Sequence, residues 1–145
     1  LVYPNAALEK LAQIIRPEGL LFLTVANDFN PIQKIATEKL DIPDWWFIPP
    51  EHVNYFNPES ITRLLEQSGY EILDISTTFP IDIFLLMGDN YVSDPKIGKK
   101  SHLRRKEFEF TLSNTGREDF KNNLYKSFKN LGIGREIEIL ATPKI

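Results

Sequence analysis

The chain has 145 residues, of which 42% are hydrophobic and 26% are charged, and its formal net charge at pH 7 is -3. This composition is average for a globular protein and excludes a disordered, fibrous or repetitive architecture. The negative net charge disfavours a chain whose main task is to bind polyanions such as nucleic acids. The length suits a single domain over residues 1–145 with a hydrophobic core of its own.

The sequence also disfavours a membrane or metal-binding protein. The longest apolar run, residues 20–26, is far shorter than the roughly 20 residues that cross a bilayer. The chain has no cysteine, and its two histidines, His52 and His102, lie far apart in the sequence. We therefore predict no bound metal and a cytoplasmic location. Because the chain starts with Leu1 and a helical pattern follows at once, we expect that it begins within a longer protein or has been processed.

The first 40 residues predict a helix, a strand and a second helix. Asn5 can cap a helix with one apolar face, which stops at residues 16–19. Residues 20–26 show no polar alternation, as in a strand that is buried on both faces of a parallel sheet. Asn30 and Pro31 supply the cap and first residue of a helix that reaches Leu40.

The next segment, residues 41–56, contains three prolines and the aromatic run Trp45, Trp46 and Phe47. This composition predicts a rigid flap rather than a helix or a strand. Asn57 and Pro58 then begin a further helix, which Gly69 ends, and residues 70–79 alternate as a second strand does.

The remainder predicts a helical insertion at residues 81–131 and a last strand at residues 136–141. One helix is expected around residues 103–112, and a second one carries Phe120, Leu124, Phe128 and Leu131 on one face. The alternation of helices and strands predicts an α/β domain. Only three strands are expected, so the outer edge of the first strand has no partner within the chain.

Two passages of the chain resemble class I methyltransferases that use S-adenosylmethionine. In the first, residues 15–25, Pro17 and Gly19 lead from a helix directly into an apolar strand. In the second, residues 50–61, His52, Tyr55 and Phe56 precede a helix that ends at Gly69. Residues 78–91 and 131–136 are similar to the tail of an uncharacterised bacterial branch of this family.

The resemblance implies that the chain is the C-terminal portion of a Rossmann-like fold of seven strands. The three strands would be the last three, two of them parallel and one antiparallel, with the final strand between the other two and helices covering the sheet. In the family, a glycine-rich loop and an acidic residue near the first two strands bind S-adenosylmethionine. Neither feature occurs here, so we expect the cofactor to bind the full-length parent protein and not this chain alone.

Candidate site residues follow from position and from the resemblance. Asn27 and Asp28 end the first strand, where ligands of open α/β sheets bind, although such residues also form local turns. The resemblance places the segment of Glu51, His52 and Tyr55 beside the substrate. His52 is then a candidate general base, with the alternative that it only attaches the flap to the domain.

Other residues have simpler interpretations. Trp46 and its aromatic neighbours could cover a substrate, but anchoring of the flap is favoured. One basic segment lies in the insertion and suggests solvated charge rather than a phosphate or nucleic-acid site, because acidic residues follow it directly; it comprises Lys96, Lys99, Lys100, His102, Arg104, Arg105 and Lys106.

The sequence thus predicts the substrate-side part of a methyltransferase that acts on an unknown small molecule and is inactive without its cofactor-binding half. The alternative is a non-enzymatic interaction module, in which the open sheet edge pairs with a second copy or another chain.

Overall fold

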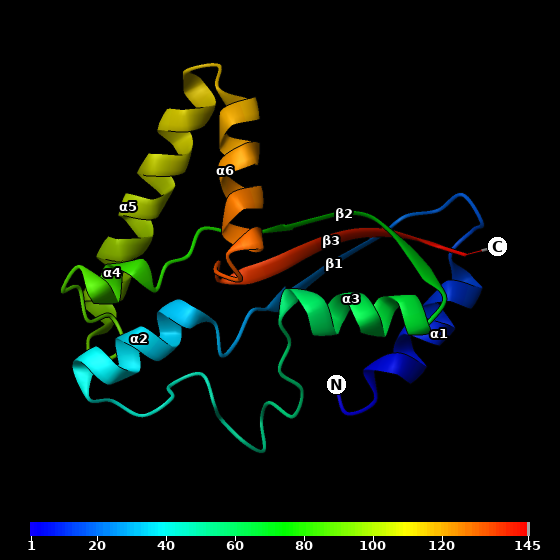
Figure 1. Ribbon diagram of the computed structural model, residues 1–145, viewed down its shortest axis with the longest axis horizontal. Coiled ribbons are helices and arrows are strands. Elements are labelled where there is room, and N and C mark those ends of the chain that lie inside the picture. The colour runs from blue at the N-terminus through cyan, green and yellow to red at the C-terminus, as the bar shows by residue number, and fades with distance from the viewer. Residues whose placement is uncertain (145) are drawn as a thin grey trace.

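The computed structural model describes residues 1–144, which form six helices and three strands (Figure 1). In chain order the elements are α1 (Pro4–Ile14), β1 (Leu21–Ala26), α2 (Pro31–Leu40), α3 (Pro58–Gln67), β2 (Tyr70–Thr77), α4 (Ile83–Leu86), α5 (Pro95–Asn114), α6 (Glu118–Asn130) and β3 (Glu136–Pro143). The fold is therefore mixed α/β, as predicted. Among the described residues, no helix is both long and apolar enough for a membrane crossing.

The three strands form one sheet in the order β1-β3-β2, so the last strand lies between the other two. Both neighbouring pairs are antiparallel, with Leu23 opposite Ile139 in one ladder and Ile75 opposite Ile139 in the other. The predicted position of the last strand is confirmed. The parallel pairing expected for the first strand is wrong, because its partner among the described residues is the antiparallel β3. Strands β1 and β2 run in the same direction but are not neighbours.

The expected burial of β1 on both faces is also wrong. Its alternate residues Leu21, Leu23 and Val25 pack against the core, whereas the ring of Phe22 on the other face is 64% exposed. An apolar run without alternation cannot reveal which face other elements cover, because coverage depends on residues elsewhere in the chain.

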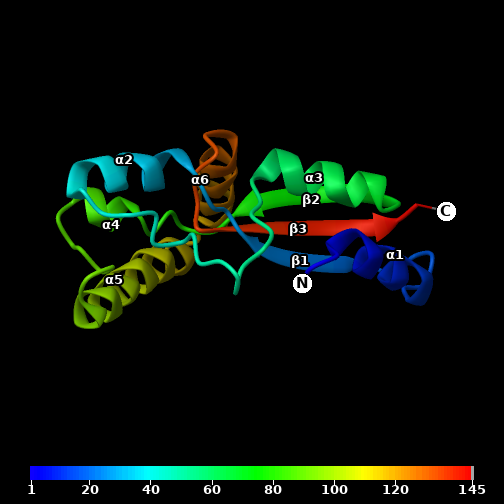
Figure 2. The same ribbon diagram turned by 90° about the horizontal axis from the view of Figure 1, so that it is seen from below.

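The core lies between the sheet and two helices that cover the same face (Figures 1 and 2). Leu8 of α1 and two residues of α3, Ile61 and Leu65, pack against the middle of β3. Tyr70 is fully buried beside them, and its hydroxyl donates a hydrogen bond to the carbonyl of Leu8 at 2.9 Å. This contact attaches α1 to the start of β2.

Local signals predicted several helix ends correctly. Asn30 and Asn57 each form a capping box with the residue three positions later, and a proline follows each cap. Gly69 after α3 has a φ of +85°, the left-handed conformation expected there. The cap predicted at Asn5 is wrong, because α1 already begins at Pro4, which occupies the first helical position.

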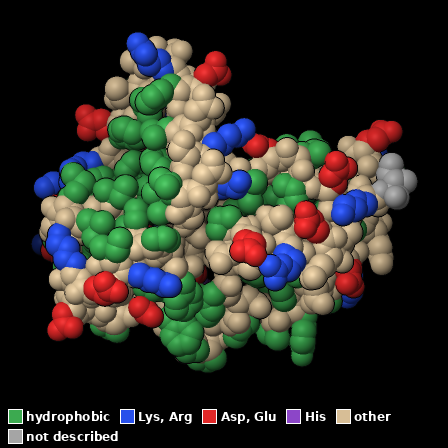
Figure 3. Space-filling view, viewed as in Figure 1, with side chains coloured by type: hydrophobic (Ala, Val, Ile, Leu, Met, Phe, Trp, Pro, Cys, Tyr) green, Lys and Arg blue, Asp and Glu red, His purple; other side chains and the backbone are tan. Residues whose placement is uncertain are grey.

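The predicted insertion contains α4, α5 and α6, and α5 and α6 form a hairpin that projects from one end of the sheet (Figure 1). Helix α5 starts at Pro95, well before the expected residue 103. Its polar first half carries no apolar periodicity, so the pattern predicted only the second half of the helix. Apolar side chains gather on the α5 side of this hairpin (Figure 3). Two apolar residues of α5, Leu103 and Phe110, are exposed.

Candidate functional site

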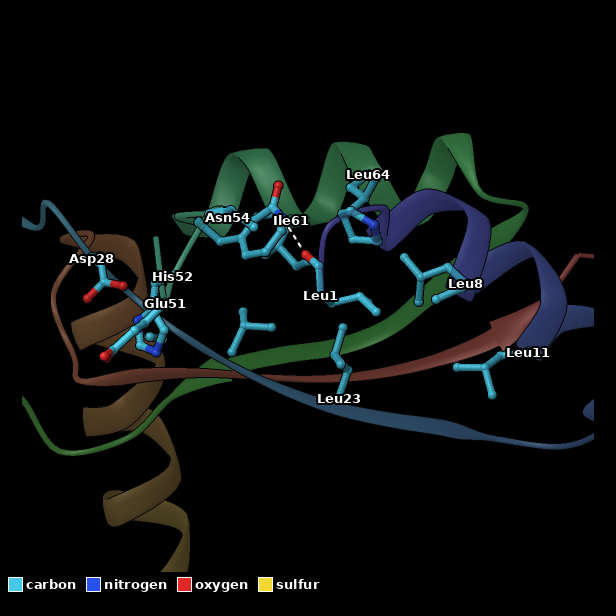
Figure 4. Close-up of a pocket in the computed structure, with 16 residues that line it drawn as sticks. Leu1, Leu8, Leu11, Leu23, Asp28, Glu51, His52, Asn54, Ile61 and Leu64 are labelled. Carbon is cyan, nitrogen blue, oxygen red and sulfur yellow. Dashed lines mark hydrogen bonds between the residues drawn. The ribbon is translucent and has the colours of Figure 1, made fainter. Parts of the chain in front are cut away.

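A cavity of about 330 Å³ lies between α1, β1, α3 and the flap at residues 41–56 (Figure 4). Its walls are mostly aliphatic and come from all four segments. The aliphatic side chains that line it include Leu8, Leu11, Leu23, Val25, Ile61 and Leu64. Such a volume and such walls are typical of small-molecule sites.

Three of the residues proposed from the sequence meet at one end of this cavity. Figure 4 shows Asp28, Glu51 and His52 together, away from the leucine side chains at the other end. Asp28 follows β1, whereas Glu51 and His52 belong to the flap. The backbone N–H of Asp28 donates to the carbonyl of Phe56 at 3.2 Å, so the strand end and the flap are directly joined.

Asp28 is 6% exposed, and its charge is balanced by an arginine from a distant part of the chain. Nη1 of Arg135 lies 3.4 Å from Oδ1 of Asp28. This partner was missed in the sequence, because it is 107 residues away and no local pattern connects the two. A nearly buried carboxylate needs such a partner, since desolvation of an unpaired charge is costly.

His52 is exposed, and the loop around it is fixed through its backbone. Its N–H donates to the carbonyl of Ile48 at 3.1 Å, and its own carbonyl accepts the hydroxyl of Tyr55 at 3.1 Å. The same hydroxyl oxygen accepts the N–H of Ile48 at 3.2 Å. The backbone, and not the imidazole, therefore makes these flap contacts, and the ring stays available at the cavity end.

Trp46 and Tyr55 do not line the cavity, and instead attach the flap to Phe29 in the turn after β1. Trp46 is 4% exposed and meets the ring of Phe29 edge-on, with 5.7 Å between ring centroids. Tyr55 packs on the same ring at 5.5 Å. Phe29 was not singled out in the sequence; it has a φ of +59° in the turn after β1, which aims its ring into this aromatic cluster.

Asn27 is fully buried and lies outside the cavity lining. Its side-chain amide donates to the carbonyls of Gly132 and Gly134 at 3.1 and 3.0 Å, and its backbone N–H donates to the carbonyl of Arg135. These bonds connect the end of β1 to the loop before β3. Asn27 thus positions Arg135, the partner of Asp28.

A second polar cluster lies around Asp82, between β2 and α4. Asp82 is 1% exposed and accepts a hydrogen bond from the hydroxyl of Tyr91. Burial raises the pKa of Asp82, while the Tyr91 hydrogen bond and the positive charge of Arg135 act in the opposite direction. Burial and the neighbouring carboxylate of Asp82 also raise the pKa of Tyr91.

The basic segment of α5 is partly paired within the hairpin region. Arg104 pairs with Asp89 and lies over the ring of Phe84, and Arg105 pairs with Glu109 at 2.5 Å. Lys96, Lys99 and Lys100 are exposed. Among the described residues, no group of three or more carboxylate or histidine side chains is arranged to hold a metal ion.

The sequence model of the methyltransferase domain family matches residues 1–75, from α1 into β2. The chain belongs to this family. The matched part of the methyltransferase domain contains the whole cavity and the cluster of Asp28, Glu51 and His52, whereas the α5–α6 hairpin lies outside it. No curated protein matches the chain.

Proposed function

We propose that this chain is the C-terminal, substrate-side part of a class I S-adenosylmethionine-dependent methyltransferase from the bacterial branch that its tail resembles. The observation that carries the proposal is the family match over residues 1–75, the segment that holds the cavity. The strand order supports it, because an antiparallel last strand between the other two is what the resemblance implies. The methyl acceptor is a small molecule, and we expect the reaction in the cytoplasm.

The described residues do not fit the cofactor. S-adenosylmethionine sites of this fold need a glycine-rich turn between a strand and the N-terminus of a helix. Residues 27–30 join β1 to α2 without a glycine, whereas Gly132 and Gly134 precede β3, and Thr77 fills the space at Gly134. We therefore propose that another part of the parent protein binds the cofactor and that this chain alone is inactive.

The chain's own residues would bind the acceptor and handle its proton. An acceptor in the cavity has its reactive end beside Asp28, Glu51 and His52. When that end carries a proton, a base must remove it, and the exposed imidazole of His52 is suited to this role. Asp28 and Glu51 would orient the reactive end through hydrogen bonds.

Two measurements test this proposal. Calorimetric titration of S-adenosylmethionine into the 145-residue chain should give no binding, and stoichiometric binding would place the cofactor site within it.

In the protein that joins this chain to its cofactor-binding part, His52→Gln should lower kcat about 100-fold or more without changing cofactor affinity. His102→Gln in α5 is the control, and equal effects of the two changes would argue against a base at His52.

The second candidate function is an interaction module, and the open edge of β1 favours it. Within residues 1–144, β1 pairs with β3 along one edge only, and Leu20 and Phe22 are 59% and 64% exposed. An unpaired edge of this kind can add a strand from another chain. Sedimentation velocity of the chain would show a concentration-dependent dimer in this case, and a monomer at high concentration would exclude self-pairing.

A further inference from the structure

The cavity has an apolar body and one polar end, and this division limits what it can bind. Its wall residues Leu8, Leu11, Leu23, Val25, Ile61 and Leu64 are aliphatic, and they come from α1, β1 and α3. Among the described residues, Phe56 is the only phenylalanine, tyrosine or tryptophan that lines the cavity. Branched aliphatic walls on several sides suit a flexible alkyl chain, whereas stacking of a planar ring needs aromatic faces.

The polar end carries more negative than positive charge. Asp28 and Glu51 both line the cavity, and Arg135 contacts one carboxylate oxygen of Asp28 from outside the lining. Carboxylates only accept hydrogen bonds, so the head group of a ligand must donate them. A ligand carboxylate or phosphate would be repelled at this end, because like charges in a partly desolvated site are strongly unfavourable.

From these two features we propose that the cavity binds an alkyl amine, with the aliphatic part against the leucine walls and the nitrogen between Asp28 and Glu51. Among head groups, an ammonium both donates hydrogen bonds and carries the complementary charge. The binding stands on the cavity alone. The further statement that this amine is the methyl acceptor rests on the proposed function above.

The binding is tested with the 145-residue chain and three probes that share one alkyl chain: octylamine, octanol and octanoate. Chemical-shift changes in the backbone amide spectrum give both the affinity and the location. We expect octylamine to bind about tenfold or more tightly than octanoate, with octanol between them and shifts at Leu23, Val25 and Leu64. Octanoate binding as tight as octylamine binding would overturn the proposal, as would shifts confined to the α5–α6 hairpin.

Two variants separate the polar end from the apolar body. Glu51 is exposed, so Glu51→Gln should leave the fold intact while weakening octylamine several-fold and leaving octanol unchanged. Glu59→Gln, a carboxylate of α3 that does not line the cavity, is the matched control and should have no effect. Ala7→Phe places a ring in the cavity and should weaken all three probes. Equal octylamine affinity in the wild type and Glu51→Gln would contradict the assigned head-group site.

The outcome also distinguishes this inference from the proposed function. If octylamine binds as described but the parent protein transfers no methyl group to any alkyl amine, the amine site stands and its role as the acceptor site fails. If methyl transfer occurs to acceptors without an amine and octylamine does not bind, the methyltransferase proposal stands and the amine site is wrong.

Discussion

Gly134 packs directly against Thr77, with no space for a side chain between them. A Cβ atom at Gly134 would lie 2.5 Å from both Cβ and Oγ1 of Thr77, far inside van der Waals contact. The backbone of Gly134 also has a φ of +116°, which residues with a side chain rarely adopt. This contact joins the end of β2 to the loop before β3, at the residue that precedes Arg135, the partner of Asp28.

We predict that Gly134→Ala lowers the free energy of unfolding by about 2 to 4 kcal/mol, from backbone strain and overpacking together. Gly132→Ala is the matched control: its φ is +70°, but a Cβ there meets no atom within 4 Å. The control should lose about 1 kcal/mol, the cost of the left-handed conformation alone. Urea unfolding measures both, and equal losses would show that the Thr77 contact contributes nothing.

The side chain of Asn27 should matter for stability because it bonds the same loop. Asn27→Asp keeps the shape but replaces the donating amide, so that a carboxylate faces the carbonyls of Gly132 and Gly134. We expect a loss of about 2 to 4 kcal/mol in urea unfolding at neutral pH. Asn122→Asp on the exposed side of α6 should change the stability by less than about 0.5 kcal/mol. If Asn27→Asp were as mild, the assigned amide orientation would be wrong.

The sequence predicted features that depend on neighbouring residues. The caps at Asn30 and Asn57 and the left-handed Gly69 are local, because each needs only residues within one turn. The start of α5 did not follow from apolar periodicity, because this part of the helix lacks it, although Asp94 and Pro95 form the same cap-and-proline signal.

The site was predictable as a set of residues but not as an arrangement. Asp28 and His52 were singled out separately, one from its strand end and one from the family resemblance. Their meeting at one cavity depends on the path of the flap, which the contact between the buried Trp46 and the ring of Phe29 helps to fix. The pairing of Asp28 with Arg135 depends on the antiparallel placement of β3 beside β1, a long-range contact without local signal.

Asp82 should make the stability depend on pH in an unusual direction. Its pKa in the folded state is raised above the ordinary 3.8, mainly by burial, so the folded protein favours the neutral carboxyl. The contribution of this neutral form is complete below pH 3.8 and is lost as the pH rises through the folded pKa. Asp82→Asn stays neutral and can still accept the Tyr91 hydroxyl.

The difference in unfolding free energy between Asp82→Asn and the wild type should therefore move in favour of the variant between pH 4 and pH 7. Urea unfolding of both proteins at several pH values measures it, and groups that titrate equally in both cancel. A difference that stays constant over this range would show that Asp82 ionises as easily in the folded as in the unfolded chain.

Trp46 should control the order of the flap, and through it the position of Glu51 and His52. The N–H groups of these two residues donate to the carbonyl of Ile48, two residues after the buried Trp46. Trp46→Ala leaves a large cavity beside Phe29 and should cost about 3 kcal/mol or more if the flap unfolds together with the domain. If the flap opens by itself, global stability changes less and the two amides lose protection instead. Hydrogen exchange at Glu51 and His52 distinguishes these outcomes, with Phe110→Ala, at an exposed residue of α5 outside the flap, as the control. Unchanged stability together with unchanged exchange in Trp46→Ala would show that Trp46 does not anchor the flap.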